Sequence, residues 1–144
     1  MDVGSGGGAP GIPLALALPE QEFVLLEAQE RKCVFLREQA PATARVVWGR
    51  AEEQAVDWAG CALAKALAPP TVAAEWSLPL VGSGGAVVLW VGPTADPEAI
   101  RAVAERLAAK VEAAPDGFVV LRKTGPTPEG FPRRPGMAKK RPLA

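Results

Sequence analysis

Histidine is absent from this chain of 144 residues, and cysteine occurs only twice. Cys33 and Cys61 stand far apart and form no C-x-x-C pair. Because transition metals are held by clusters of His, Cys and carboxylate ligands, these shortages argue against a metal site. Two separate cysteines are typical of a reducing compartment, where they serve as small buried hydrophobic residues. We therefore expect a cytoplasmic protein without a metal.

Long hydrophobic runs are missing as well. No stretch is long enough to span a bilayer, and the N-terminus lacks the charged and then apolar pattern of a secretion signal. The apolar fraction of 49% and the length fit one domain with a real core. We expect no membrane partner.

The net charge is zero, but the charges are unevenly distributed. Residues 1–121 carry nine basic and fifteen acidic side chains, whereas residues 122–144 carry seven basic and one acidic. Five prolines in this last segment exclude a regular helix or an interior strand there. The sequence thus predicts a domain over 1–124 and an extended Pro-rich, basic tail over 125–144, which either faces a polyanion or only aids solubility.

Segments of strand and helix character alternate along the domain. Strands are predicted at 22–27, 44–49, 60–64, 86–91 and 118–121, helices at 10–18, 29–40, 71–78 and 96–110, and a glycine turn at 82–85. This alternation predicts an α/β fold, with helices on both faces of the sheet and a ligand at the carboxyl ends of its strands.

A glycine loop opens the chain as D-V-G-S-G-G-G, residues 2–8. Glycines at this spacing let the backbone turn sharply and approach a ligand closely, as in methyltransferases that bind an adenosyl cofactor. Dinucleotide-binding folds are the alternative, with Gly4, Gly6 and Ala9 as a weaker G-x-G-x-x-A match. Glu27, at the end of the next strand, suits the ribose hydroxyls of either cofactor, although a solvated strand-end acid also explains it.

The loop needs a buried strand in front of it, but only Met1 precedes Asp2. We therefore expect the first strand to be absent. Since a central strand bonds to two neighbours, its loss leaves buried N–H and C=O groups unpaired. We expect this chain to be marginally stable or inactive, as an incomplete gene product.

Four strings carry a resemblance to a known family. They are D-V-G-S-G-G-G-A-P-G-I-P-L-A from residue 2, L-L-E-A-Q-E-R-K-C-V-F-L-R from residue 25, G-R-A-E-E from residue 49, and K-T-G-P-T-P-E-G-F-P-R-R-P-G-M-A-K-K-R-P-L from residue 123. The chain resembles the ribosomal RNA small subunit methyltransferase G family, also called glucose-inhibited division protein B. The last string is the most diagnostic, because glycine loops recur in many enzymes.

The resemblance implies a Rossmann-like class I S-adenosylmethionine-dependent methyltransferase sheet, here lacking the first strand and an N-terminal helical region. It implies S-adenosylmethionine as donor, N7 of a guanine in 16S rRNA as acceptor, and 16S rRNA or the small ribosomal subunit as partner of a monomer. Guanine N7 already presents a lone pair, so methyl transfer needs alignment and no general base. We therefore expect no catalytic acid or base and no Asn-Pro-Pro-Tyr motif.

The resemblance also assigns cofactor-binding residues. Gly4 and Ala9 would line the methionine side of the cofactor, Glu27 its ribose, and Ala51 with Glu52 its adenine. The full predicted set is Gly4, Gly6, Ala9, Glu27, Ala51, Glu52 and Lys65. Lys65 stands where the family usually has Arg, so it offers a point charge instead of a planar fork. A first-turn acid at a helix N-terminus is the other interpretation of Glu52.

The tail supplies the predicted RNA-binding residues Arg133, Arg134, Lys139, Lys140 and Arg141, which suit phosphate contacts. Trp48, Phe118 and Phe131 are candidate stacking surfaces, but we expect Trp48 and Phe118 in the core. Val91 replaces the usual Lys of a K-G-P turn, and the region before Phe118 is shortened. Val91 and the absent strand favour the alternative of a non-catalytic ribosome- or RNA-binding protein.

Overall fold

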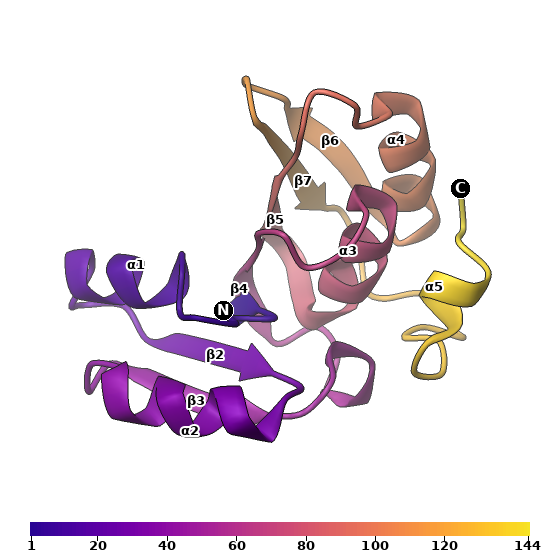
Figure 1. Cartoon of the computed structure of the whole chain (residues 1–144). Coiled ribbons are helices and arrows are strands. Elements are labelled where there is room, and N and C mark those ends of the chain that lie inside the picture. The colour runs from indigo at the N-terminus through magenta and orange to yellow at the C-terminus, as the bar shows by residue number, and fades with distance from the viewer.

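The computed structural model describes all 144 residues and contains one seven-stranded sheet in the order β3-β2-β1-β4-β5-β7-β6 (Figure 1). The strands are β1 (Asp2–Val3), β2 (Phe23–Glu27), β3 (Ala44–Trp48), β4 (Ala59–Ala64), β5 (Val81–Trp90), β6 (Ala109–Ala113) and β7 (Phe118–Lys123). Strands β1 to β5 are parallel, and β7 is antiparallel to both β5 and β6. The predicted α/β fold class is confirmed.

The chain also contains five α-helices and two short 3₁₀ turns, all of which lie between strands except α5. They are α1 (Gly11–Ala17), α2 (Glu30–Gln39), η1 (Ala51–Glu53), α3 (Pro70–Ser77), η2 (Leu78–Leu80), α4 (Pro97–Arg106) and α5 (Met137–Lys140). The Asp96 side chain caps α4 by accepting hydrogen bonds from the N–H groups of Glu98 and Ala99. No helix combines the length and the hydrophobicity that a membrane span requires.

Two hydrophobic clusters fill the space between helices and sheet. Leu36 of α2 and Ala15 of α1 pack with Phe23 and Leu25 of β2 in the smaller cluster. The larger cluster joins α3, α4 and strands β4 to β7. Because neighbouring strand residues point to opposite faces, Leu25 belongs to one cluster and Leu26 to the other.

The expected absence of the first strand is wrong for Asp2 and Val3, which form β1 between β2 and β4. The Met1 ammonium group also donates to the Cys61 carbonyl at 2.6 Å, and the Met1 carbonyl accepts from Leu63 N–H at 2.9 Å. On the other side of Met1 a groove of about 690 Å³ separates β2 from β4. Strand β1 is thus paired on both sides at the point where the glycine loop begins.

The structure corrects the predicted character of the tail. Residues 137–140 form the short helix α5, which fits between Pro135 and Pro142 and so avoids both rings. The tail lies beside α3 (Figure 1). Ala138 is buried in the larger cluster, and Phe131 and Leu143 pack against it.

A buried polar cluster fixes the point where the tail leaves the sheet. Lys123 Nζ, which is fully buried, donates to Asp57 Oδ1 at 3.0 Å, to Thr127 Oγ1 at 2.8 Å, and to the carbonyls of Leu78 and Val81. Burial opposes ionisation of Asp57, but hydrogen bonds from Thr127 and Lys123 outweigh it and hold the pKa of Asp57 below its usual value. The chain therefore enters the tail from a fixed position.

Two aromatic predictions have different outcomes. Trp48 was expected in the core, but it lies at the end of the edge strand β3 with 55% of its surface exposed, so this prediction is wrong. Its indole N–H donates to the Ala28 carbonyl at 3.1 Å. Phe118, which was also expected in the core, is only half-buried. Its ring lies edge-on to that of Trp90, with 5.0 Å between the centroids.

The remaining differences concern element boundaries and one cysteine. The helix expected to reach residue 110 ends at Arg106, because Ala108 adopts a left-handed conformation, and the unpredicted strand β6 follows. The glycine turn at 82–85 lies inside β5, where the pairing with β4 shifts register. Cys33 is buried as expected, whereas Cys61 is exposed.

Candidate functional site

The glycine loop leaves β1 and returns to the start of α1. Gly4, Gly6 and Gly8 have φ values of +72°, +55° and +93°, which favour glycine. A side chain at Gly4 would also collide with Leu67. The loop is tied to β2, since Gly4 N–H and Ser5 N–H both donate to the Leu26 carbonyl, at 2.8 and 3.0 Å.

Asp2 fixes the two ends of this loop. Its Oδ2 accepts from Gly11 N–H at 3.0 Å in the first turn of α1, and the Ser5 hydroxyl donates to its backbone carbonyl at 3.0 Å. Burial raises the pKa of Asp2, and the hydrogen bonds from Gly11 and Ser5 counteract that rise. The acid of the sequence motif is therefore a structural group that shapes the loop.

Glu27 is held at the end of β2 by two backbone donors. Its Oε2 accepts from Gly6 N–H at 2.9 Å and its Oε1 from Gln29 N–H at 2.8 Å. Each carboxylate oxygen has two lone pairs, so each keeps room for one further donor. Glu27 is 6% exposed, and this small exposed part faces a pocket. A pair of adjacent hydroxyl groups matches this acceptor.

The pocket, of about 250 Å³, lies at the carboxyl ends of β1 to β4. Gly4 forms part of it on the loop side, beside Glu27. Ala51 and Glu52 of η1 form another part, and Leu67 after β4 lines it directly beside Gly4. This is the edge at which parallel α/β sheets bind ligands, as the sequence predicted.

The structure brings together four of the seven predicted cofactor residues: Gly4, Glu27, Ala51 and Glu52 line the pocket. Gly6 does not line the pocket, but its N–H donates a hydrogen bond to Glu27, which does. Ala9 and Lys65 are exposed and do not line the pocket, although Ala66, next to Lys65, does.

Glu52 has a second role that its sequence position does not reveal. Its carboxylate, which is 5% exposed, accepts from Gly136 N–H in the tail at 3.1 Å and lies 3.5 Å from the Arg50 guanidinium group. Glu52 therefore lines the pocket and at the same time holds the start of α5.

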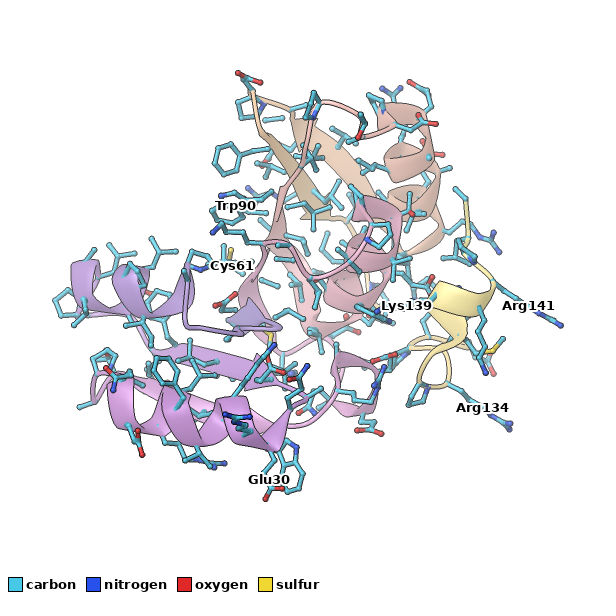
Figure 2. The ribbon with its side chains drawn as sticks, in the orientation of Figure 1. Glu30, Cys61, Trp90, Arg134, Lys139 and Arg141 are labelled. Atoms are coloured by element: carbon cyan, nitrogen blue, oxygen red, sulfur yellow. The ribbon has the colours of Figure 1, made fainter.

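The five predicted RNA-binding residues fall into two groups. Arg133 donates two hydrogen bonds of 2.6 Å to the Glu75 carboxylate, and Lys139 Nζ lies 5.1 Å from the centroid of the Trp76 ring. All of them except Arg133 are exposed, and Lys139 differs from Arg134, Lys140 and Arg141 by its contact with Trp76. Figure 2 shows Arg134 and Arg141 pointing away from the domain, while Lys139 lies over it.

Sequence reasoning did not identify Trp76 and Gln29 as pocket residues, and it did not show that Lys139 lines the pocket. Gln29 carries a detectable signal, since it follows the strand-end Glu27 by two residues. Trp76 and Lys139 carry none, because they are far apart in the chain and meet only when the tail packs on α3.

Comparison with known proteins adds to this geometry. The family model described as rRNA small subunit methyltransferase G (GidB) matches residues 1–119. The chain belongs to this family. The family member from Pelotomaculum thermopropionicum is 41% identical, over 99% of this chain and 69% of its own length. That from Synechococcus sp. (strain JA-2-3B'a(2-13)) is 36% identical, over 99% and 63%. The chain thus spans about two thirds of the length of these curated relatives.

Solved structures agree on the fold of this rRNA small subunit methyltransferase G family member. The antibiotic-resistance methyltransferase Kmr gives a TM-score of 0.66 at 13% identity, covering 86% of this chain and 85% of that one. A Thermus thermophilus 16S rRNA N2 G1207 methyltransferase, in complex with AdoMet and guanosine, gives 0.65 at 15% identity, covering 88% and 35%. The Rossmann-like class I methyltransferase fold is confirmed. The predicted cofactor agrees with this fold and family.

Proposed function

We propose that this chain binds S-adenosylmethionine in the pocket at the carboxyl ends of β1 to β4 and transfers its methyl group to 16S rRNA. The observation that carries the proposal is the Glu27 carboxylate, which Gly6 N–H and Gln29 N–H fix at the pocket wall beside Gly4. Membership of the rRNA small subunit methyltransferase G family supports the reaction and the substrate class.

The pocket residues fit the parts of this cofactor. Glu27 accepts hydrogen bonds from the two ribose hydroxyls, and the loop backbone at Gly4 allows close approach of the methionine part. Ala51 offers a small apolar wall for the adenine ring, and Glu52 offers an acceptor for its amino group. The cofactor supplies an electrophilic methyl group on a sulfonium ion.

We propose guanine N7 as the acceptor atom. Because N7 carries an unshared electron pair in the plane of the base, it attacks the methyl group without first losing a proton. The chain then has to hold base and cofactor in line and exclude water, which is catalysis by positioning. This assignment requires no proton acceptor among the pocket residues.

The exposed cations of the tail suit the RNA. Arg134, Lys140 and Arg141 stand on the segment that borders the pocket. Phosphate contacts of this kind fix the position of the nucleic acid without reading its sequence, and their strength falls with salt. We propose that a single chain acts on the small ribosomal subunit or its RNA in the cytoplasm.

A non-catalytic RNA-binding protein is the second candidate. The observation that favours it is Val91 in the Val91-Gly92-Pro93 turn, where the family usually has Lys.

Calorimetric titration with S-adenosylmethionine tests the proposal. We expect saturable binding at one site and a loss of affinity of about 10- to 100-fold in Glu27→Gln, since a hydrogen bond to a charged group contributes about 1.5–3 kcal/mol. Glu30→Gln is the matched control, because this exposed acid lies three residues away and does not line the pocket.

The transfer step is tested separately with 16S rRNA and labelled donor. Label in 7-methylguanine, identified by mass spectrometry of the digested RNA, supports the full proposal. Label in another nucleotide contradicts the N7 assignment. RNA binding without any binding of the donor supports the second candidate instead.

A further inference from the structure

We propose that the C-terminal tail is a wall of the cofactor pocket, so that tail docking and cofactor binding strengthen each other. The inference rests on the proposed function. It assigns positioning roles to Lys139 and Glu52, which, like Trp76, belong both to the pocket and to the contact between tail and domain.

The first contact is between Lys139 and Trp76. Lys139 comes from α5 and Trp76 from α3, and both side chains line the pocket. The ammonium group lies 5.1 Å from the centroid of the indole ring, within the range of a cation–π interaction. Since Trp76 is 7% exposed, it forms a fixed platform. Lys139 therefore keeps its place in the wall only while α5 lies on α3.

The second contact is between Glu52 and Gly136. Gly136 precedes α5 with φ of +82°, a conformation that favours glycine, and its N–H donates to Glu52 Oε1 at 3.1 Å. A ligand that contacts Glu52 acts on the same carboxylate that holds the start of α5. Cofactor and tail thus share one acceptor group.

The tail is anchored at a point outside the pocket. Arg133 and Glu75 form a bidentate ion pair with both hydrogen bonds at 2.6 Å, and Arg133 also donates to the Arg141 carbonyl at 2.9 Å. This pairing raises the pKa of Arg133, so it stays charged. Neither Arg133 nor Glu75 lines the pocket. The anchor can therefore be removed without removing a ligand contact.

Tail docking also sets the RNA-facing surface. With α5 on α3, Arg134 and Arg141 point into solvent (Figure 2). A cofactor that stabilises the docked tail therefore also stabilises the arrangement in which these cations are exposed to RNA phosphate groups. By linkage, RNA then raises the affinity for cofactor by the same factor as cofactor raises the affinity for RNA, and such factors are commonly about 5- to 150-fold.

The experiment measures S-adenosylmethionine affinity by calorimetry in the full chain and in two variants. Arg133→Ala releases the anchor, and we expect an affinity loss of about tenfold, within the usual range of coupling between sites. Its control is Arg101→Ala, which breaks an exposed ion pair with Glu98 on α4. Lys139→Gln keeps the anchor and removes the charge from the wall, and we expect a smaller loss. Its control is Lys110→Gln, an exposed lysine of β6.

Limited trypsin digestion gives a readout that does not depend on affinity. Cleavage after Lys139 and Lys140 reports an undocked tail, because a docked α5 resists the protease. We expect S-adenosylmethionine to slow this cleavage in the unmodified chain but not in Arg133→Ala.

The possible outcomes separate the two proposals. If the unmodified chain binds the cofactor and both variants bind it equally well, the tail is not part of the pocket and only this inference falls. If cofactor fails to slow cleavage in the unmodified chain, the coupling is also refuted. If the unmodified chain does not bind the cofactor, both the proposed function and this inference are refuted.

Discussion

The glycine loop and the C-terminal tail lie at the same pocket, but they are held there by different forces. Residues 2–11 are fixed mainly by backbone N–H groups that donate to Leu26, Glu27 and Asp2. The tail is fixed mainly by side chains, through the Arg133–Glu75 pair and through Thr127, which donates to Asp57 beside Lys123. A loop built on backbone bonds tolerates little change of conformation, whereas a tail held by a few side chains can be released by one substitution.

Lys123→Ala should break the tail side of this comparison most severely. Removing one partner from a buried ion pair costs about 3–5 kcal/mol, and here it leaves Asp57 without its cationic partner and the carbonyls of Leu78 and Val81 without the Lys123 donor. Urea denaturation measures the free energy of unfolding, with Lys110→Ala as an exposed control. A loss below about 1 kcal/mol would show that the cluster does not hold the tail.

Gly4→Val should break the loop side. A side chain there meets Leu67, and the φ of +72° is strained for valine. We expect the affinity for S-adenosylmethionine to fall by roughly 100-fold, about 2.7 kcal/mol. Gly7→Ala is the matched control in the same loop, because Gly7 has open space around its Cα and no positive φ. Equal losses in the two variants would contradict the role given to Gly4.

An added strand should sharpen the comparison by stabilising the loop from behind. The Cys61 carbonyl accepts from the Met1 ammonium group, and the N–H and C=O of one strand residue point to the same side. The Cys61 N–H therefore also faces the groove between β2 and β4. A Val- and Ile-rich segment placed before Met1 should pair with both strands and raise the free energy of unfolding by about 2 kcal/mol, from a few hydrogen bonds of roughly 0.5–1.5 kcal/mol each.

A segment of the same length that alternates with proline serves as its control, since proline lacks the N–H that the ladder needs. Amide hydrogen exchange at Cys61 gives a local readout, and we expect slower exchange only with the Val- and Ile-rich segment. Unchanged exchange and unchanged stability would show that the groove does not accept a strand.

The pH dependence of stability should give the smallest effect. Because the pKa of Asp57 is lowered in the folded chain, its contribution is complete above the unfolded pKa and is lost as the pH falls through the folded pKa. We expect Asp57→Asn to lose about 1–3 kcal/mol at pH 7, with a difference from the unmodified chain that shrinks below about pH 4. A difference that stays constant down to pH 3 would contradict this assignment.

The same comparison shows what could be predicted from the sequence. The glycine loop and Glu27 are encoded by contiguous patterns, so their place at the strand ends was predicted correctly. The contacts of Glu75 with Arg133 and of Trp76 with Lys139 join residues about 60 positions apart, and no local pattern specifies them. The sequence of the tail identified the family but did not show which of its cations face the pocket.

Errors in the fold have local causes. Trp48 is a large aromatic residue in an apolar run, which suggests a core position. Its strand lies at the edge of the sheet, however, and hydrophobic periodicity does not reveal the order of the strands. The apolar spacing of the helix at 97–106 continues to Leu107, while the left-handed Ala108 ends it. Two residues, Asp2 and Val3, are too few to be recognised as a strand without their neighbours β2 and β4.

Titration of the amide resonances of Gly6 and Gln29 with S-adenosylmethionine tests the central claim most directly, because these two N–H groups donate to the Glu27 carboxylate. The account predicts that both resonances shift and saturate together at one equivalent, and that Glu27→Gln strongly weakens the response. Saturable binding that leaves both amides unmoved, or no binding at all, would contradict it.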